Sequence, residues 1–278
     1  MGELVKSQQS RALLSQYGLN PDEPLQLPLW QDVYRVMPND FSRSALFTVK
    51  NKRTPRKALQ GVLLYHYNND VEIEFTGLEL RADDDELVWQ QVLNYAKHYP
   101  LGTEIKFTSY ELCKDLGWPT TGYYYKRIED CLTRLKANAI NFRSKRLQQL
   151  ESFSLLDKFR MEEINSRRSQ ISVAIDPVII KLFMGDNYTK NIWAHYRQLS
   201  PIARRLYDYL ASHREPYPLK LDVFRQICAS DCERAKKWKE MTKDACLELE
   251  KSTLVVYARV EDDKVIGSRY GAPVELSV

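Results

Sequence analysis

The residues that could carry out covalent or metal chemistry are few and scattered. The 278-residue chain has four histidines and five cysteines. Cys228 and Cys232 lie four positions apart, without the further ligands of a zinc finger or ribbon. His66 lacks the paired histidine that would hold the metal of a tyrosine nickase. The acids Asp83 to Glu86 suit a helix start better than a carboxylate metal cluster. We therefore expect no catalytic residue, metal or cofactor.

Nucleotide hydrolysis and membrane insertion are equally unsupported. The sequence contains no G-x-x-x-x-G-K-[ST] loop, so we expect no Walker-type ATP site. No apolar run approaches the roughly 20 residues that cross a bilayer, and the first residues lack the apolar segment of a signal peptide. An odd number of scattered cysteines fits reduced, buried thiols. These features predict a cytoplasmic, non-enzymatic protein with no membrane partner.

Positive charge is clustered rather than evenly spread. The net charge of +4 and the pI near 8.6 are too modest to indicate a nucleic-acid partner on their own. A solvated surface and a phosphate-binding surface both explain such clusters until their positions are known. The clusters are Lys50, Lys52, Arg53, Arg56 and Lys57, and then Arg143, Lys145 and Arg146.

Two long predicted helices separate apolar from basic side chains at helical spacing. In the first, Ile128 and Leu132 fall opposite Lys126 and Arg127. In the second, Trp238 and the apolar residues that follow it fall opposite a series of lysines. A recognition helix needs one face for its domain and one for the DNA groove. An ordinary half-buried helix has the same pattern, so the interpretation depends on what surrounds each helix.

That surrounding pattern occurs twice in the chain. Tyr95 and Tyr209 are 114 positions apart, as are Phe107 and Leu221. Each copy reads helix, short strand, short helix, long helix and two apolar strands, which is the order of a winged helix-turn-helix. We therefore predict an α+β fold of two tandem winged-helix domains related by internal pseudo-duplication, preceded by a flexible N-terminal arm.

Local signals place the boundaries of these elements. Thr108 with Glu111 and Ser230 with a glutamate three residues later form capping-box patterns, and Ser200 precedes a proline suited to a first helical position. The acids at 83–86 start a helix over 84–99, and the wings fall at 150–160 with 170–175 and at 254–260 with 264–270. The predicted divisions are an arm at 1–30, winged-helix domains at 31–180 and 181–270, and a tail at 271–278.

The residues expected to contact DNA lie on the outer faces of the long helices, in the wings and in the basic clusters. Arg127 and Arg134 could read guanine, whereas lysines and wing arginines would hold phosphates. Basic side chains beside tyrosines could also hold single-stranded DNA. The predicted set is Tyr123, Lys126, Arg127, Arg134, Arg143, Lys145, Arg146, Arg234, Lys236, Lys237, Lys239, Lys243, Arg259, Arg269, Lys50, Lys52 and Arg53.

Four long stretches carry a family resemblance. They read MPNDFSRSALFTVKNK, GLELRADDDELVWQQVLNYAK, YELCKDLGW and LSPIARRLYDYLASHREPYPLKLDVFR. The chain resembles the TrfA-type plasmid replication initiators from about residue 25 to 270. The resemblance implies binding to direct repeats, called iterons, at a plasmid origin, opening of an adjacent A+T-rich segment, and host DnaA and DnaB helicase as partners. It also implies tandem winged-helix domains and a monomer-dimer equilibrium in which monomers initiate.

The arm contains a short peptide with a further resemblance. Gln26, Leu27, Leu29 and Trp30 resemble the Q-L-x-L-F peptide that docks on the bacterial DNA polymerase sliding clamp, with tryptophan in place of phenylalanine. Packing of these residues on the first domain is the alternative. For the whole chain, a winged-helix transcriptional regulator is the first alternative function, and a nickase is the second.

Overall fold

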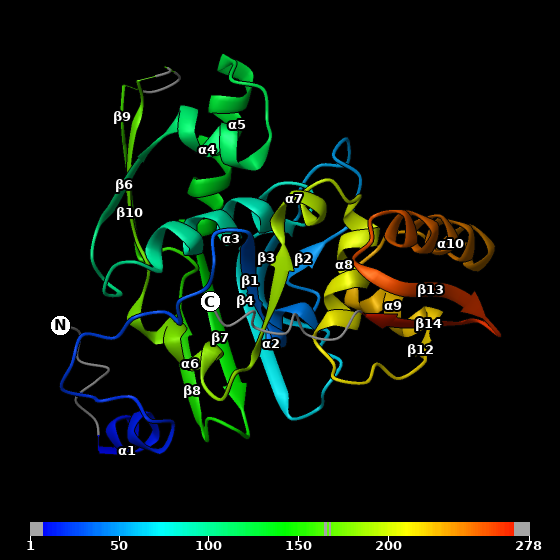
Figure 1. Cartoon of the computed structure of the whole chain (residues 1–278), viewed down its shortest axis with the longest axis horizontal. Coiled ribbons are helices and arrows are strands. Elements are labelled where there is room, and N and C mark those ends of the chain that lie inside the picture. The colour runs from blue at the N-terminus through cyan, green and yellow to red at the C-terminus, as the bar shows by residue number, and fades with distance from the viewer. Residues whose placement is uncertain (1–7, 164–165, 167, 270–278) are drawn as a thin grey trace.

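The computed structural model describes residues 8–163, 166 and 168–269, and it mixes helices and strands along the whole of that range (Figure 1). The expected α+β class is therefore confirmed. The first strands and helices are α1 (Gln8–Gln16), β1 (Tyr34–Pro38), α2 (Asn39–Ser42), β2 (Phe47–Thr48), β3 (Ala58–Leu64), β4 (Val71–Leu78) and β5 (Leu80–Arg81).

The first of the two predicted copies contains its elements in the expected order. Strand β10 lies in the middle of a three-stranded antiparallel sheet, between β6 and β9. Helix α5 packs against α3 and α4, beside this sheet (Figure 1). The elements are α3 (Asp85–Ala96), β6 (Ile105–Thr108), α4 (Ser109–Leu116), α5 (Gly122–Lys136), β9 (Lys158–Glu162) and β10 (Gln170–Ala174).

The second copy has the same element order and the same order of strands in its sheet. Here β14 lies between β12 and β13, and α10 packs against α8 and β13. Figure 1 shows α10 and its sheet at the opposite side of the molecule from β6, β9 and β10. The elements are α8 (Pro201–Ala211), β12 (Leu219–Lys220), α9 (Leu221–Ile227), α10 (Ala235–Lys251), β13 (Val255–Glu261) and β14 (Lys264–Arg269).

A hairpin interrupts the first copy between α5 and β9. Strands β7 (Asn138–Ser144) and β8 (Gln149–Phe153) extend β3 and β4 into a four-stranded sheet in the order β3-β4-β7-β8. The predicted wing over 150–160 is therefore wrong in its first half, because β8 belongs to this separate sheet. Alternate residues of β4, including Ile73 and Phe75, are buried, as in a sheet with one covered face.

The two copies share a continuous core. Strand β1 pairs antiparallel with β11 (Tyr188–Ile192), which joins an early segment to one that follows the first copy. The predicted boundary at 180/181 falls inside α6 (Ile180–Phe183), whose four residues are all buried. The short helices η2 (Pro177–Ile179) and α7 (Trp193–Tyr196) complete this junction. Buried side chains from both copies form one cluster.

Residues 8–30 of the predicted arm pack onto the rest of the chain. Leu14 and Leu27 are buried, and so is Trp30 at the end of this segment. This packing differs from the expectation of a flexible arm, because the segment contributes apolar side chains to the core. The arm's residues 1–7 and the tail at 271–278 lie outside the described residues. Among the helices that the structure describes, none is long and apolar enough to span a membrane.

Helix caps agree with the local sequence in two of three predicted cases. The Thr108 and Glu111 capping box is present at α4, and the Ser200 side chain accepts a hydrogen bond from the Ala203 backbone N-H at α8. The predicted box at Ser230 is wrong, since α10 begins after Arg234 and has no side-chain cap. The helix predicted over 84–99 is α3, with Asp84 as its N-cap.

Candidate nucleic-acid interface

Helix α5 has the predicted division into an apolar and a polar face. Ile128, Leu132 and Leu135 are fully buried beneath it. On the outer side, Tyr123 is 72% exposed, and Lys126 bridges to Glu129 and Asp130 at 2.9 and 3.2 Å. Exposed side chains therefore occur in the N-terminal half of α5, which is the part that a recognition helix places against base edges, as well as at Thr133 and Lys136 nearer its end.

The two arginines predicted to read guanine are tied into the protein instead. Arg134 Nη2 lies 2.9 Å from an Asp85 carboxylate oxygen, and its side chain is only 12% exposed. Arg127 Nη2 lies 2.5 Å from Asp83, and its guanidinium carbon is 4.5 Å from the Trp118 ring. These contacts contradict the expectation that both side chains project freely, because the acids that start α3 compete for them.

The acids at the start of α3 form the centre of this arginine network. Burial alone would raise the pKa of Asp84, but Arg56, Arg134 and Arg127 outweigh it and lower that pKa. Burial and then the Asp84 charge raise the pKa of Asp85 to about 6. The sequence correctly predicted a helix start here but not the burial of its carboxylates.

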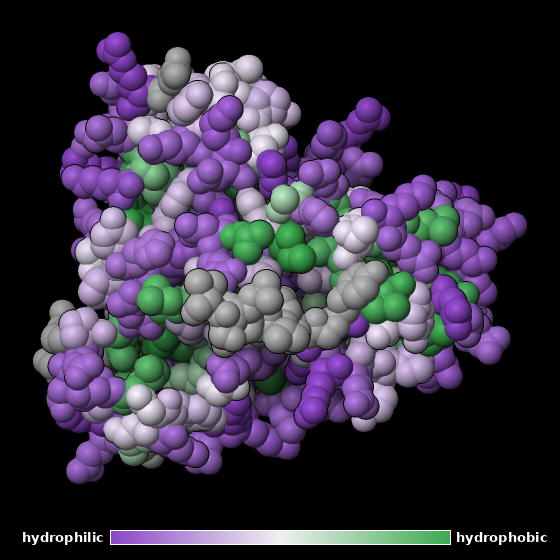
Figure 2. All heavy atoms as spheres, in the orientation of Figure 1, coloured by the Kyte–Doolittle hydropathy of each residue, from purple (hydrophilic) through white to green (hydrophobic). Residues whose placement is uncertain are grey.

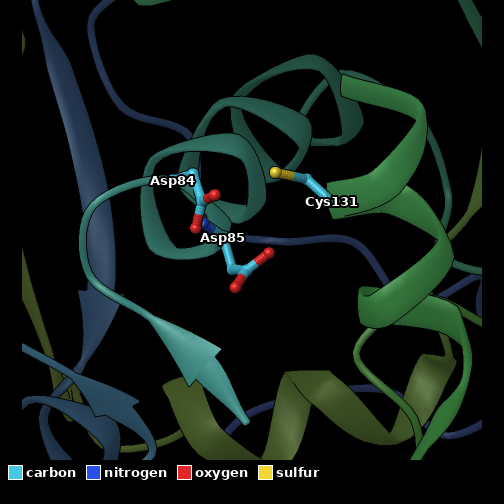
Figure 3. Close-up of side chains that lie close together, drawn as sticks. All are labelled: Asp84, Asp85 and Cys131. Carbon is cyan, nitrogen blue, oxygen red and sulfur yellow. The ribbon is translucent and has the colours of Figure 1, made fainter. Parts of the chain in front are cut away.

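The same acids lie close to a cysteine. Figure 3 shows Asp84 and Asp85 from the start of α3 and Cys131 from α5 pointing into the space between the two helices, and their ligand-type atoms lie within 4.8 Å of one another. Burial, followed by the two carboxylates, raises the pKa of the Cys131 thiol well above its usual value, so it is neutral. Guanidinium groups already neutralise the carboxylates, and this cluster is therefore an arginine-carboxylate network.

Helix α10 presents the more open basic face. Trp238 is buried, packs 5.4 Å from the Phe224 ring between centroids, and donates a hydrogen bond to the Leu221 carbonyl. Figure 2 shows mostly hydrophilic side chains around this helix. Two of its lysines have acidic neighbours, Lys239 with Asp263 at 2.7 Å and Lys237 with Glu240 at 3.6 Å. The predicted residues exposed here are Arg234, Lys236, Lys237 and Lys243.

The loop that follows β2 brings the first basic cluster against α5. A pocket of about 430 Å³ lies between residues 52–56 and the outer face of α5. Lys52 and Arg53 line it from the loop, and Tyr123 and Lys126 line it from the helix. Lys50, predicted as a DNA contact, instead pairs with the buried Glu79. Two sets of candidate residues that are far apart in the sequence thus meet at one place.

The remaining predicted contacts are dispersed. Arg146 is tied inward by Asp40 at 3.3 Å and by backbone carbonyls, and Arg269 donates to the Ala211 carbonyl. Arg143 and Lys145 are exposed beside acids of β4 and the turn before it, and Arg259 pairs with Glu261 on β13. Arg146 therefore supports the protein's own structure rather than an exposed surface.

The clamp-like peptide is partly covered. Leu27 and Trp30 are buried, and the Trp30 indole donates to Asn94 at 2.9 Å. Gln26 donates to the Lys97 carbonyl at 2.8 Å, whereas Leu29 is exposed. Three of the four residues predicted to dock on a clamp are therefore engaged with the folded chain, so the alternative of packing on the first domain describes this structure.

The residues that assemble this surface are not among those predicted from the sequence. Arg56 reaches the Asp84 and Asp85 carboxylates at 2.8 and 2.6 Å, and Arg81 donates to the Asn51 and Thr54 carbonyls at 2.9 and 2.6 Å. The sequence does contain a hint of this arrangement. Residues 50–57 are basic without any acid, and residues 83–86 are all acids. Opposite charges that segregate in sequence are candidates for pairing in space.

Comparison with known proteins identifies the family of this chain. A model of the TrfA protein family matches residues 14–269. Plasmid replication initiator protein TrfA of Escherichia coli is 57% identical over 236 residues, which cover 85% of this chain and 62% of that protein. Replication protein RepA of Salmonella typhi is 26% identical over 164 residues, or 55% of this chain and 45% of RepA. The chain thus spans less than two thirds of the length of either relative.

A fold likeness extends to a solved structure of lower sequence similarity. Domains 2 and 3 of RctB superpose with a TM-score of 0.55 at 14% identity, covering 83% of this chain and 96% of that one. This likeness concerns the fold alone. The family match over nearly all of the described residues, together with 57% identity to a curated relative, shows that this chain belongs to the TrfA family.

Proposed function

We propose that this chain initiates plasmid replication by binding direct repeats at the plasmid origin through two winged-helix units. The observation that carries the proposal is the repeated setting of two amphipathic helices. Helices α5 and α10 each follow a short strand and a short helix and precede a strand pair with the same sheet order. Each also carries basic residues on its outer face. Family membership supports the same role.

The two helices contribute differently in this proposal. The N-terminal half of α10 offers exposed lysines, so Lys236 and Lys237 are the strongest candidates for base or phosphate contacts. Arg134 is assigned a supporting role because it is bound to Asp85. Tyr123 and Lys126 are the α5 residues proposed to reach DNA directly, with the wing residue Arg259 on the flanking backbone.

The experiment is a binding titration over a salt series. Purified protein is mixed with duplex DNA carrying the direct repeats of its plasmid, or with a shuffled duplex of equal length. We expect repeat DNA to bind roughly a thousandfold more tightly, the scale of a specific complex. Lys237→Ala is expected to weaken binding, whereas Lys190→Ala, an exposed lysine on β11, is the matched control. Equal affinity for both duplexes contradicts the proposal.

A transcriptional regulator is the second candidate, because tandem winged helices suit both roles. Reactivity of unpaired thymines to permanganate on supercoiled origin DNA separates the two. Opening of an A+T-rich segment by the bound protein supports an initiator, while repeat binding without opening supports a regulator. A covalent tyrosine-DNA adduct formed with magnesium or manganese would instead indicate a nickase.

The proposal also includes host partners and control of activity. The bound protein recruits host DnaA, DnaB and the sliding clamp, and a monomer-dimer equilibrium controls initiation. Docking on the clamp requires Leu27 and Trp30 to leave the core, so it competes with their packing. Trp30→Ala is expected to reduce stability by about 3 kcal/mol or more in chemical unfolding, whether or not a clamp is present. Exposed Leu29 is the more informative position, since Leu29→Ala affects clamp binding with little effect on stability.

A further inference from the structure

The pocket between the 52–56 loop and α5 has an excess of positive charge that the described residues do not neutralise. Its lining contains seven basic residues and three acidic ones. Arg56, Arg127 and Arg134 are bound to the acids that start α3, and Lys126 to Glu129 and Asp130. Lys52 and Arg53, in contrast, are exposed and have no ion pair with any residue in the described part of the chain. The uncompensated charge therefore lies at the loop side of the pocket.

The loop is held in a fixed position relative to α5. Arg56 bonds to Asp85, and Arg134 of α5 bonds to the other oxygen of the same carboxylate. Arg81, which precedes α3, donates to the Asn51 and Thr54 carbonyls. An anion bound by Lys52 and Arg53 would thus sit in a defined register with the residues that α5 presents.

The free donors around the pocket suit a phosphodiester. The Lys52 ammonium and the Arg53 guanidinium line the pocket from the loop, and the exposed Tyr123 contributes a hydroxyl from the first turn of α5. A DNA backbone phosphate takes hydrogen bonds from Lys, Arg and Tyr side chains in this way, and such contacts fix orientation without reading sequence. The acids behind the arginines leave the deeper wall close to neutral, so the anion is held at the rim.

We propose that this pocket receives one phosphate of the duplex backbone beside the groove that α5 enters, with Lys52 and Arg53 as its ligands and Tyr123 as a third donor. The inference rests on the proposed DNA-binding function and deepens it. The basic loop then gives the first winged-helix unit a second contact with DNA, in addition to α5. The arginine-carboxylate network fixes the position of this loop relative to α5.

The test compares the double variant Lys52→Ala/Arg53→Ala with Lys57→Ala, an exposed lysine in the same segment that does not line the pocket. Affinity for repeat and shuffled DNA is measured across a salt series. Each lost phosphate contact lowers the slope of log affinity against log salt by about 0.9. We expect the double variant to lower this slope by about 1 on both duplexes and to keep the repeat preference, while Lys57→Ala leaves the slope unchanged.

Phosphate ethylation interference locates the contact. Ethylation of one particular backbone phosphate per repeat is expected to block DNA binding by the wild-type protein. Ethylation of that same phosphate is expected to have no effect on DNA binding by the double variant. An unchanged slope, or an equal loss in Lys57→Ala, overturns the inference. If the wild type lacks repeat preference, the proposed function fails, yet the slope on shuffled DNA still tests the pocket. Unchanged thermal melting confirms that the exposed substitutions leave the fold intact.

Discussion

Among single residues, Asp85 has an unusual protonation. It is fully buried at the start of α3, and burial together with Asp84 raises its pKa from 3.8 to about 6. Between those pH values the folded chain retains a proton that the unfolded chain releases, so the free energy of unfolding falls as pH rises through this window. We expect the wild type to lose about 1 kcal/mol between pH 5 and pH 7 relative to Asp85→Asn, which cannot titrate.

The measurement is urea unfolding of both proteins at the two pH values. Comparison with Asp85→Asn removes the contribution of other titrating groups, such as His66. The margin of the wild type over Asp85→Asn in the free energy of unfolding is expected to be smaller at pH 7 than at pH 5, because only the wild type has to release the Asp85 proton in its folded state. A margin that grows with pH would mean that Asp85 is ionised at pH 5.

Glycine is required at position 117 because the backbone is left-handed there and because Arg197 leaves no space for a side chain. It ends α4 with φ +69°, and a Cβ there would lie 1.6 Å from Arg197 Nη1. Gly117→Ala is expected to destabilise the protein by about 1–2 kcal/mol from the left-handed backbone alone, with displacement of Arg197 in addition. Gly122→Ala at the start of α5 is the control, since a Cβ there meets nothing within 4 Å. Equal thermal melting of the two variants contradicts this account.

Among the elements, α4 depends on its capping box. The Thr108 hydroxyl accepts from the Glu111 backbone N-H, and the Glu111 carboxylate accepts from the Thr108 backbone N-H. Thr108→Ala is expected to cost about 1 kcal/mol in the free energy of unfolding. Ser230→Ala, where the expected box is absent, is expected to cost less. A comparable loss at both positions, measured by urea unfolding, would indicate that hydroxyl removal rather than capping is responsible.

Elements with a local signal were predictable from sequence. The apolar faces of α5 and α10 follow from residue spacing, and the capping box at α4 follows from two residues three positions apart. The four-stranded sheet was missed because β4 pairs with β7, a strand beyond the whole α3-to-α5 segment. Arg127 and Arg134 were assigned to DNA for a similar reason. Their partner acids lie more than 40 positions away, and helical periodicity carries no information about such contacts.

For the whole molecule, Arg205 connects the two copies. Its side chain is fully buried on α8 and contacts Glu86 of α3 at 3.2 Å, Asp208 at 3.0 Å and the Ser44 carbonyl at 2.7 Å. Arg205→Ala leaves two carboxylates without their cation, and we expect a loss of about 3–5 kcal/mol. Exposed Arg214→Ala is the control, and urea unfolding measures the loss.

The shared core also predicts that the wild type unfolds as one unit. Urea unfolding of the wild type, monitored by tryptophan fluorescence and by circular dichroism, is expected to give coincident transitions. Two separated transitions would contradict a shared core.

The pairing of β1 with β11 also affects how the chain folds while it is being synthesised. Tyr34 pairs with Ile192, so the early strand has no partner until the ribosome has synthesised the whole first copy and the segment up to β11 that follows it. At cellular translation rates, roughly 150 residues take on the order of 10–30 s. During that interval Val36 and Met37, which become fully buried, are without their final covering. A nascent chain therefore covers this strand only late in synthesis, and slower translation of the segment between β1 and β11 would lengthen its exposure to chaperones and proteases.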